Sequence, residues 1–380
     1  MIQPNFFFLF YLSMLSMIGF LATDMYLPVF EKIEQDFQVN ADFTSFSLSI
    51  FIFGLAIGQI LSGFLAEKKG DKNVLSLGLM VFCVSSCVLF ITDNSYLFLL
   101  ARLTQGIGAA APTAIWQAIA IKNFSSEQSK AIFRKVMPLV ALSPALAPIF
   151  GSCIAGISSW QYIFCLLAAI SLVLLFFTNK KLNKTTNNTE HNQPSISFMH
   201  LLKNRDYMQY VTIYSLCSAL FFAFLTGWSN IMTEFGNDEF SIGLSFIPQT
   251  ICFIAGGFSL KYLTKKTSET RALKHLLSSI FIALILIWIL EIGLNMQELG
   301  FILPLCIIAF ANGAIYPIVS HKALSVFKQQ TAFAAGFQNF ISLFTCFAFS
   351  ALVTQIINYS AVYSVLIVMT LVCILLYFVS

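Results

Sequence analysis

Residues 6–28 read FFFLFYLSMLSMIGFLATDMYLP, an apolar run that ends in an acidic residue and a proline. A helix needs about 20 mostly apolar residues to cross the hydrocarbon core of a bilayer, and this stretch is long enough. No charged residue precedes it and no small-residue cleavage site follows it, so we do not expect a cleaved signal peptide. We interpret it as the first of several membrane-spanning helices.

The composition of the whole chain agrees with that interpretation. Of its 380 residues, 58% are hydrophobic, 15% are aromatic and only 10% are charged, whereas soluble proteins carry about 25% charged residues. So few charges exclude a disordered protein and a nucleic-acid-binding protein. The formal net charge of +4 says little by itself, and the positions of the charges are more informative.

Twelve apolar stretches of the chain are long enough to be membrane helices. They lie near residues 6–30, 44–65, 74–92, 97–119, 133–157, 160–178, 208–231, 242–262, 275–295, 299–319, 331–357 and 361–379. Together they use most of the sequence and leave no room for a separate soluble domain. All nine cysteines fall within them, with neither CxxC nor histidine-paired spacing, so we expect no disulfide framework, no metal site and no cofactor.

The longest polar stretch divides these helices into two sets of six. We predict an all-α membrane protein with an N-terminal half over residues 1–178, a cytoplasmic linker over residues 179–206 and a C-terminal half over residues 207–380. Two pseudo-symmetric halves are typical of duplicated transporters. The halves share two short echoes, Gly63-Phe64 with Gly257-Phe258 and Gln105-Gly106 with Asn312-Gly313.

The basic residues are distributed unevenly between the two sides of the predicted membrane. The loops on the side of both termini contain 19 of the 21 Lys and Arg, the opposite loops contain Lys32 alone, and Arg102 lies inside the fourth helix. Cytoplasmic loops of membrane proteins are rich in Lys and Arg. We therefore predict a multi-pass protein of the inner membrane with both termini in the cytoplasm.

Two ionisable residues, Asp24 and Arg102, lie clearly inside predicted spans, and Glu291 lies near the outer end of the ninth helix. A charge at the centre of a bilayer costs at least about 2.5 kcal/mol, so such residues usually face a cavity or a partner. From the helical rise, Asp24 is roughly 9 Å from the outer end of the first helix, and Arg102 is about 8 Å from that of the fourth. At this similar depth the two can form a pair.

An Asp24–Arg102 pair would give a physical basis for proton coupling. Separating a buried carboxylate from an arginine favours the protonated carboxyl, so we expect Asp24 to exchange the proton and Arg102 to tune that exchange. Two plainer roles remain open. Asp24 could be a polar residue at a helix end weakened by Pro28, and Arg102 could serve a purely structural ion pair.

Polar and aromatic side chains recur at three- and four-residue steps on several predicted helices, which places each set on one helical face. Such faces would line a mostly apolar cavity that suits amphipathic organic molecules. The residues are Met17, Phe20, Tyr26, Gln105, Thr113, Trp116, Tyr214, Phe221, Trp228, Asn312 and Tyr316. For each aromatic among them, contact with lipid or packing between helices is the simpler alternative.

Four stretches resemble motifs of the major facilitator superfamily, and within it of the twelve-helix drug:proton antiporters of the bicyclomycin/chloramphenicol-resistance (Bcr/CflA) branch. They are Ala22–Pro28 (ATDMYLP), Gly63–Lys72 (GFLAEKKGDK), Arg102–Ala110 (RLTQGIGAA) and Ser143–Gly151 (SPALAPIFG). All four lie in order on helices one, two to three, four and five. The resemblance implies alternating access and the export of drug-like compounds.

The same stretches imply a set of gating and structural residues. They are Gly63, Glu67, Lys68, Gly70, Lys72, Gly106, Pro144, Pro148 and Gly151. The prolines should kink the fifth helix, and its small residues should let a neighbouring helix approach closely. Glu67 should face the positive N-terminal end of the eleventh helix, near Thr331, and so latch the outward-facing state.

Four positions depart from the family's pattern. Glu67 replaces the usual aspartate of the loop, and Lys68 replaces the usual arginine. Asp71 stands where a basic residue is common, and Ser152 replaces the second glycine of the helix-5 motif.

We therefore expect a monomeric transporter whose partners are a small-molecule substrate, protons and the lipid bilayer, and not nucleic acid. The first alternative keeps the fold but carries an endogenous metabolite, such as a siderophore or an organic acid, in either direction; Arg102 would then meet a substrate carboxylate. A non-transporting membrane sensor is a remote alternative. The sequence contains no P-loop and no catalytic cluster of His, Cys, Asp and Glu, so we expect neither direct ATP drive nor an enzyme.

Overall fold

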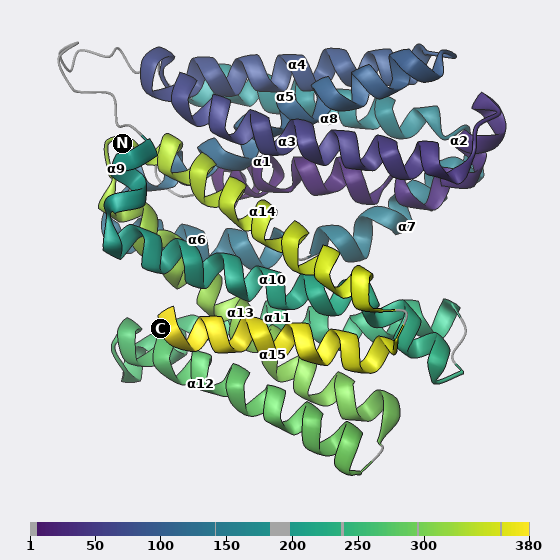
Figure 1. The fold of residues 1–380 in the computed structure, drawn as a ribbon. Coiled ribbons are helices and arrows are strands. Elements are labelled where there is room, and N and C mark those ends of the chain that lie inside the picture. Colours follow the sequence, from purple (N-terminus) through teal and green to yellow (C-terminus); the bar gives the residue numbers. More distant parts are fainter. Residues whose placement is uncertain are drawn as a thin grey trace. The chain divides into compact units, whose positions relative to one another are not determined.

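The computed structural model of the chain describes residues 6–140, 142–182, 198–236, 239–294, 296–357 and 359–379. Within these ranges every regular element is a helix (Figure 1). The elements are α1 (Phe6–Asp24), η1 (Leu27–Val29), α2 (Phe30–Phe37), α3 (Ala41–Lys69), α4 (Asp71–Ile91), α5 (Ser95–Asn123), α6 (Ser126–Val140), α7 (Leu142–Ile157), α8 (Gln161–Lys181), α9 (Phe198–Lys203), α10 (Arg205–Glu234), α11 (Glu239–Lys266), α12 (Glu269–Ile287), η2 (Trp288–Gly293), α13 (Gln297–Val326), α14 (Thr331–Ile356) and α15 (Ala361–Val379). The prediction of an all-α membrane protein is confirmed.

Ten segments of the described chain are long and apolar enough to cross a membrane by length and composition. The two predicted spans outside this set are α5 and the segment that forms α6 and α7. The helix α5 has 29 residues, but polar side chains such as Arg102 and Gln105 dilute its apolar character. The segment of α6 and α7 is divided into two helices, and the apolar part is the shorter stretch Leu146–Ile157.

The chain forms two compact units, which we call unit 1 and unit 2. Unit 1 comprises Met1–Ile132, Leu142–Phe198 and Phe327–Phe340, and unit 2 comprises Phe133–Ala141, Met199–Val326 and Ile341–Ser380. The first ten residues of α14 thus belong to unit 1 and the rest of that helix to unit 2. The predicted halves instead divide the chain at the linker. That the two halves arose by duplication stays a prediction.

In unit 1 the central helix is α5, which packs against α1, α3 and α4 (Figure 1). Nineteen of its 29 residues are buried. Its small residues allow this, since a Cβ on Gly106 would lie 2.1 Å from the carbonyl oxygen of Phe51 on α3. Because α5 is surrounded by protein, it can hold polar side chains that a lipid-facing helix could not.

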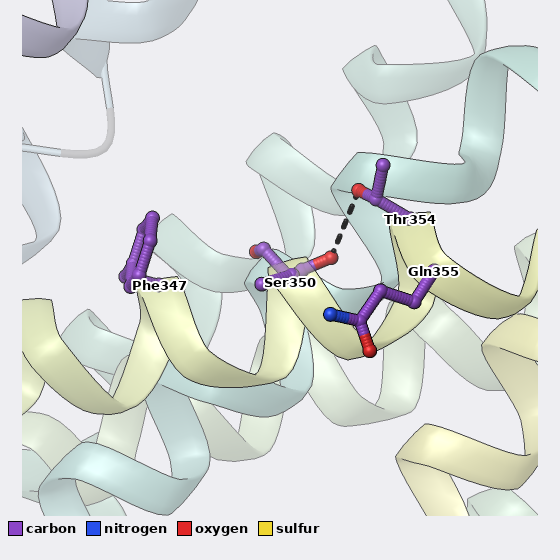
Figure 2. Close-up of a pocket in the computed structure, with 5 residues that line it drawn as sticks. Phe347, Ser350, Thr354 and Gln355 are labelled. Atoms are coloured by element: carbon purple, nitrogen blue, oxygen red, sulfur yellow. Dashed lines mark hydrogen bonds between the residues drawn. The ribbon is translucent and has the colours of Figure 1, made fainter.

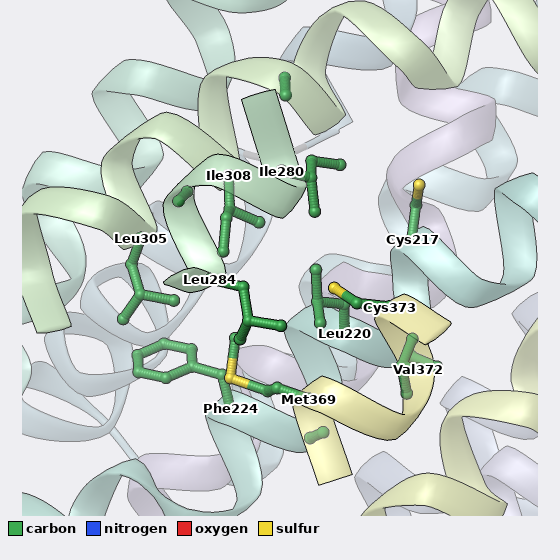
Figure 3. Packing of buried hydrophobic residues seen from close by; sticks show 14 of the residues in the cluster. Cys217, Leu220, Phe224, Ile280, Leu284, Leu305, Ile308, Met369, Val372 and Cys373 are labelled. Carbon is green, nitrogen blue, oxygen red and sulfur yellow. The ribbon is translucent and has the colours of Figure 1, made fainter. Parts of the chain in front are cut away.

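In unit 2 the helix α13 has the corresponding place, in contact with α10, α11 and α12. Its apolar side chains meet those of α10, α12 and α15 in a continuous hydrophobic core. Figure 3 shows part of this core, in which Phe224, Leu284 and Met369 come together from three different helices. Burial of such side chains contributes about 1.5–3 kcal/mol each when they leave water.

The first membrane segment, Phe6–Phe37, is interrupted after Asp24. The helix α1 ends at Asp24, and Pro28 lies in the short η1 that follows, where its missing N–H and fixed φ do not allow α1 to continue. The short amphipathic helix α2 follows, and Ile33 is its buried residue. The N–H of Met25 still donates to the carbonyl oxygen of Leu21, and the break leaves the carbonyl of Ala22 without the backbone donor of a continued helix.

Candidate functional site

The arginine predicted to lie in the membrane is fully buried in unit 1. One terminal nitrogen of Arg102 donates to the carbonyl oxygen of Ala22 on α1 at 3.2 Å and to Oε1 of Gln105 at 2.7 Å. The amide of Gln105 in turn donates to Ser86 on α4 at 2.9 Å. This network holds Arg102 against one of the carbonyls freed by the break in α1, where a cation also interacts favourably with the helix dipole.

The guanidinium of Arg102 lies between two aromatic rings. Its central carbon is 4.4 Å from the centroid of Tyr26 and 4.5 Å from that of Phe51. The hydroxyl of Tyr26 is fixed by a hydrogen bond with Ser47. Such contacts stabilise a buried cation by about 2 kcal/mol when it is desolvated. They explain how an arginine remains inside the unit without a carboxylate partner.

The carboxyl group of Asp24 lies at the C-terminal end of α1 and is not bonded to Arg102. Its Oδ1 accepts a hydrogen bond from the hydroxyl of Thr23 at 3.0 Å, while its Oδ2 is buried without a partner. The guanidinium also has two atoms, Nε and the second terminal nitrogen, that are buried without a hydrogen bond. The predicted pair is therefore not formed in this structure, although both groups have unused bonding capacity near the same helix end.

The helix-5 motif makes direct contact with the helix-1 motif. A Cβ on Gly151 of α7 would lie 2.0 Å from the carbonyl oxygen of Met25, so only a glycine fits there. Pro148 lies inside α7, and Pro144 lies in the same helix with a side chain outside the described part. The break beside Asp24 is thus packed against α7 on one side, while Arg102 of α5 binds its last turn.

The remaining predicted cavity residues of unit 1 have different environments. Met17, Thr113 and Trp116 are buried, whereas Phe20 is 41% exposed. The carbonyl oxygen of Thr113 accepts a hydrogen bond at 3.5 Å from Asn339, which lies in the part of α14 that belongs to unit 1. Asn339 was not singled out from the sequence, because a lone asparagine in an apolar span carries no motif.

The loop motif lies where α3 meets the start of α14. A Cβ on Gly63 would be 2.8 Å from the carbonyl oxygen of Ala332, and one on Gly336 would be 2.2 Å from that of Gln59. Glu67 is one turn further along α3, with its Oε1 buried and without a partner. The hydroxyl of Thr331 donates to two carbonyls of its own turn, so the structure records no bond between it and Glu67.

Two basic residues of the loop motif have partners other than Glu67. Lys68 lies over the ring of Phe64 at 4.2 Å, and Lys72 donates to the carbonyl oxygen of Asn179 at 2.9 Å. Gly70 has a φ of 83°, a left-handed value that favours glycine between α3 and α4. These contacts are consistent with anchoring of the loop.

Asp71, which departs from the family's pattern, forms an ion pair with the end of α5. The Nζ of Lys122 donates to both carboxylate oxygens of Asp71 at 2.9 Å. Both side chains are largely shielded, with 14% of Asp71 and 25% of Lys122 exposed. The acid thus has a partner on the neighbouring helix, which joins the start of α4 to the end of α5.

The aromatic residues predicted in unit 2 divide into two groups. Tyr214 on α10 and Tyr316 on α13 lie with ring centroids 5.0 Å apart, and Phe253 on α11 is 5.6 Å from Tyr316. One turn from Tyr316, the amide of Asn312 donates to the carbonyl oxygen of Cys217 at 3.3 Å, and its Oδ1 is buried without a partner. We call these five residues the tyrosine cluster.

The second group lies away from the tyrosine cluster. Trp228 is fully buried in the hydrophobic core, where its ring contacts Phe224 and Phe301 and its N–H donates to Ser245 at 2.7 Å. Phe221 is 38% exposed on the same helix. Trp228 therefore has the packing role that was the simpler alternative for an aromatic of this face.

A pocket of the described structure lies elsewhere. It is lined by side chains of α14 alone, and Figure 2 shows Phe347, Ser350, Thr354 and Gln355 along one side of that helix. None of the predicted cavity residues is among them. The part of the chain that the structure describes also holds no group of three His, Cys, Asp or Glu that could bind a metal ion.

Comparison with known proteins agrees with the motifs in both sequence and fold. A bicyclomycin resistance protein homolog of Haemophilus influenzae is 27% identical over 367 residues, which cover 93% of this chain and 89% of that protein. The chloramphenicol resistance protein CraA of Acinetobacter baumannii is 27% identical over 154 residues, 40% of this chain and 37% of that protein. The solved structure of FucP, a transporter in the outward conformation, has a TM-score of 0.74 at 15% identity and 98% coverage of both chains.

The family's sequence profile matches residues 12–350, which is most of the chain. Its motifs, its helical fold and its spans agree with that match, and the two predicted six-helix halves are consistent with the fold of FucP. The chain is accordingly a multi-pass membrane transporter and not an enzyme. It belongs to the major facilitator superfamily.

Proposed function

We propose that the chain is a proton-coupled exporter of drug-like, amphipathic small molecules that works by alternating access as a monomer. It would lie in the inner membrane with both termini in the cytoplasm. The relatives named for bicyclomycin and chloramphenicol resistance support export of such compounds. The observation that carries the proton coupling is that Asp24 and Arg102 both lie at the last turn of α1, have buried polar atoms without partners, and are not bonded to each other.

The bonding of Asp24 favours a protonated carboxyl in this structure. One oxygen of the group has only the hydroxyl of Thr23 as donor, and the other is buried without a donor. A carboxylate charge with so little compensation in an apolar site would be strongly destabilising. A neutral carboxyl group has a much smaller need for partners, so we propose this geometry as the proton-loaded state.

Loss of that proton would change the partner of Arg102. The guanidinium has two buried nitrogens without acceptors, and a new carboxylate charge two residues from Ala22 would compete for them. Movement of Arg102 from the Ala22 carbonyl toward Asp24 would release the last turn of α1. Because Gly151 packs directly on Met25, that movement would also be transmitted to α7.

The substrate would be recognised by mostly neutral groups. The tyrosine cluster supplies aromatic faces, hydroxyl groups and the unused Oδ1 of Asn312. Within unit 1 the proposed substrate contacts are Met17, Phe20, Thr113 and Gln105, and within unit 2 Phe221 is a further one. The contact of Gly63 with α14, with Glu67 beside it, would close the cytoplasmic side in the outward-facing state.

Proton flux in proteoliposomes tests this proposal. Addition of a transported drug to vesicles that contain the wild-type protein should drive proton movement, and Asp24→Asn should abolish that movement while the protein still inserts and elutes as one species. Thr23→Val is the matched control, because it removes the donor to Asp24 and leaves the carboxyl group in place. Wild-type proton flux in Asp24→Asn would overturn the assignment.

The metabolite alternative rests on one observation, the two unused nitrogens of Arg102, which could bind a substrate carboxylate. The full burial of Arg102 in unit 1 favours the coupling role instead. Cells that lack the protein separate the two proposals. Sensitivity to structurally unrelated drugs supports drug export, whereas a growth defect confined to iron limitation supports transport of a siderophore.

A further inference from the structure

The short helix α2 is bonded near both of its ends to the segment that runs from α7 to α8. The Nζ of Lys32 donates to the carbonyl oxygen of Ala155 at 2.6 Å. The ring N–H of Trp160, the residue before α8, donates to Oδ2 of Asp36, also at 2.6 Å. Lys32 and Asp36 lie one turn apart, a spacing that suits an ion pair within a helix. Each instead bonds outside its own helix, so α2 is attached to its neighbours at two points.

Lys32 has an unusual place among the basic residues. In the predicted topology it is the one Lys or Arg in the loops opposite the two termini. The basic residues on the side of the termini can be explained as topological anchors, but that explanation does not apply to Lys32. Its bond to Ala155 gives it a role in the fold instead.

The partner of Lys32 is a carbonyl group in the last turn of α7, which ends at Ile157. The N–H of Ser158 still donates to the carbonyl oxygen of Ile154 at 2.8 Å. The carbonyl of Ala155, one residue further, is among those that the end of a helix leaves without a backbone donor. A lysine at this end supplies a donor and also interacts favourably with the helix dipole.

The same face of α7 holds the chain on both sides of the break after α1. Gly151 packs against the backbone of Met25, which precedes η1, and Ala155 binds Lys32, which follows η1. Gly151 and Ala155 are one turn apart on α7, about 6 Å along its axis. Neighbouring turns of one helix therefore fix the separation between the end of α1 and the start of α2.

We propose that Lys32 is a positioning residue for proton coupling, which makes the break beside Asp24 move together with α7. This inference rests on the proposed function of Asp24 and Arg102. In that mechanism a change of proton on Asp24 moves the last turn of α1, and Gly151 transmits the movement to α7. Lys32 provides the second connection, from α2 to α7. Without it, Asp24 would exchange protons while α7 stays in place, and protons would cross without drug.

Proton and drug fluxes in proteoliposomes test the role of Lys32. Lys32→Met keeps the apolar part of the side chain and removes the donor. It should raise the proton leak without drug about fivefold, the effect of one lost hydrogen bond on an equilibrium, and lower the amount of drug exported per proton at an unchanged KM. Lys32→Arg retains a charged donor and should restore the wild-type ratio. Gln35→Ala, which removes an exposed side chain on the same helix, is the matched control and should not change it.

Hydrogen exchange of the same variants in detergent measures the connection directly. The N–H groups of Met25 and Val29 are hydrogen-bonded in the break. Peptides that cover them should exchange faster in Lys32→Met than in the wild type or in Gln35→Ala. Elution as one species shows that each variant is folded.

The outcomes separate this inference from the proposed function. Absence of drug-driven proton movement in the wild-type protein would overturn the proposed function, and the inference with it. A coupled wild type with an unchanged leak and an unchanged ratio of drug to protons in Lys32→Met would overturn the inference alone. Wild-type exchange at the break in Lys32→Met would do the same.

Discussion

Units 1 and 2 contain the same packing contact with different chemistry beside it. In unit 1 a Cβ on Gly106 would lie 2.1 Å from the carbonyl oxygen of Phe51, and in unit 2 one on Gly313 would lie 1.9 Å from that of Phe253. Each glycine follows an amide residue, Gln105 or Asn312. In unit 1, however, the guanidinium of Arg102 lies over the ring of Phe51. In unit 2 the ring of Phe253 contacts the ring of Tyr316 instead.

The difference indicates that helix packing is shared between the units and that charge is not. Two helix backbones touch at both places, so each place requires a glycine. This requirement explains why an amide residue followed by glycine occurs in both units. The buried cation occurs in unit 1, beside a break in α1, while the corresponding place in unit 2 holds neutral amide and phenol groups. We infer that coupling depends on unit 1 and substrate affinity more on unit 2.

The largest effect should come from breaking the shared contact. Gly106→Val and Gly313→Val each force a side chain against a backbone carbonyl, and we expect a loss of about 3 kcal/mol of stability, the upper part of the range for overpacking. The yield of monodisperse protein and its Tm measure this loss. Gly156→Val on α7 is the matched control, since no atom lies within 4 Å of its Cβ position. Normal stability of either core variant would show that the contact is not shared.

A second prediction separates coupling from affinity. Arg102→Met should abolish substrate-driven proton movement, and Arg102→Lys should leave a partial defect with a shifted pH dependence, because lysine cannot bond as a planar fork. Asn312→Leu should instead raise the KM for the substrate about fivefold, the effect of about 1 kcal/mol from one lost hydrogen bond. Loss of proton coupling in Asn312→Leu would contradict the division between the units.

A third prediction concerns the two groups of aromatic residues in unit 2. Tyr316→Leu should weaken substrate affinity by about 1 kcal/mol, the size of an aromatic contact, with a small effect on Tm. Trp228→Phe should do the reverse, because its ring fills the core and its N–H bonds to Ser245. Binding and thermal unfolding measured on the same samples distinguish the two. A changed affinity at unchanged Tm in Trp228→Phe would indicate that Trp228 contacts the substrate and does not serve the core.

We expect the smallest effect from substitutions at two equivalent contacts between helix ends. In unit 1 Lys122 of α5 forms an ion pair with Asp71 at the start of α4, and in unit 2 Lys322 of α13 donates at 3.3 Å to Thr270 near the start of α12. Lys122→Gln should lower stability by about 1 kcal/mol, the upper end for pairs of this exposure, and Lys322→Gln by less. The exchange Asp71→Lys with Lys122→Asp should restore the Tm, and failure to do so would argue against the pair.

Sequence patterns predicted the helices and the burial of Arg102, because length, hydropathy and unpaired charge leave direct traces in composition. They did not predict the partner of Arg102, since a backbone carbonyl at Ala22 has no signature in the sequence. The end of α1 at Asp24 was left open as a plainer alternative suggested by Pro28, and the break now forms part of the site. Trp228 could not be assigned either, because core-facing and cavity-facing sides of a membrane helix have the same composition.

The membership of α14 in both units bears on the order in which the protein can fold during synthesis. Unit 1 includes Phe327–Phe340, so its last segment is made after most of unit 2, although before Ile341–Ser380 of that unit. The contacts of Gly63 with Ala332 and of Thr113 with Asn339 cannot form until that stretch has left the ribosome. Until then the face of α3 that contacts α14 has no protein partner, and lipids or a membrane insertase must cover it in the membrane.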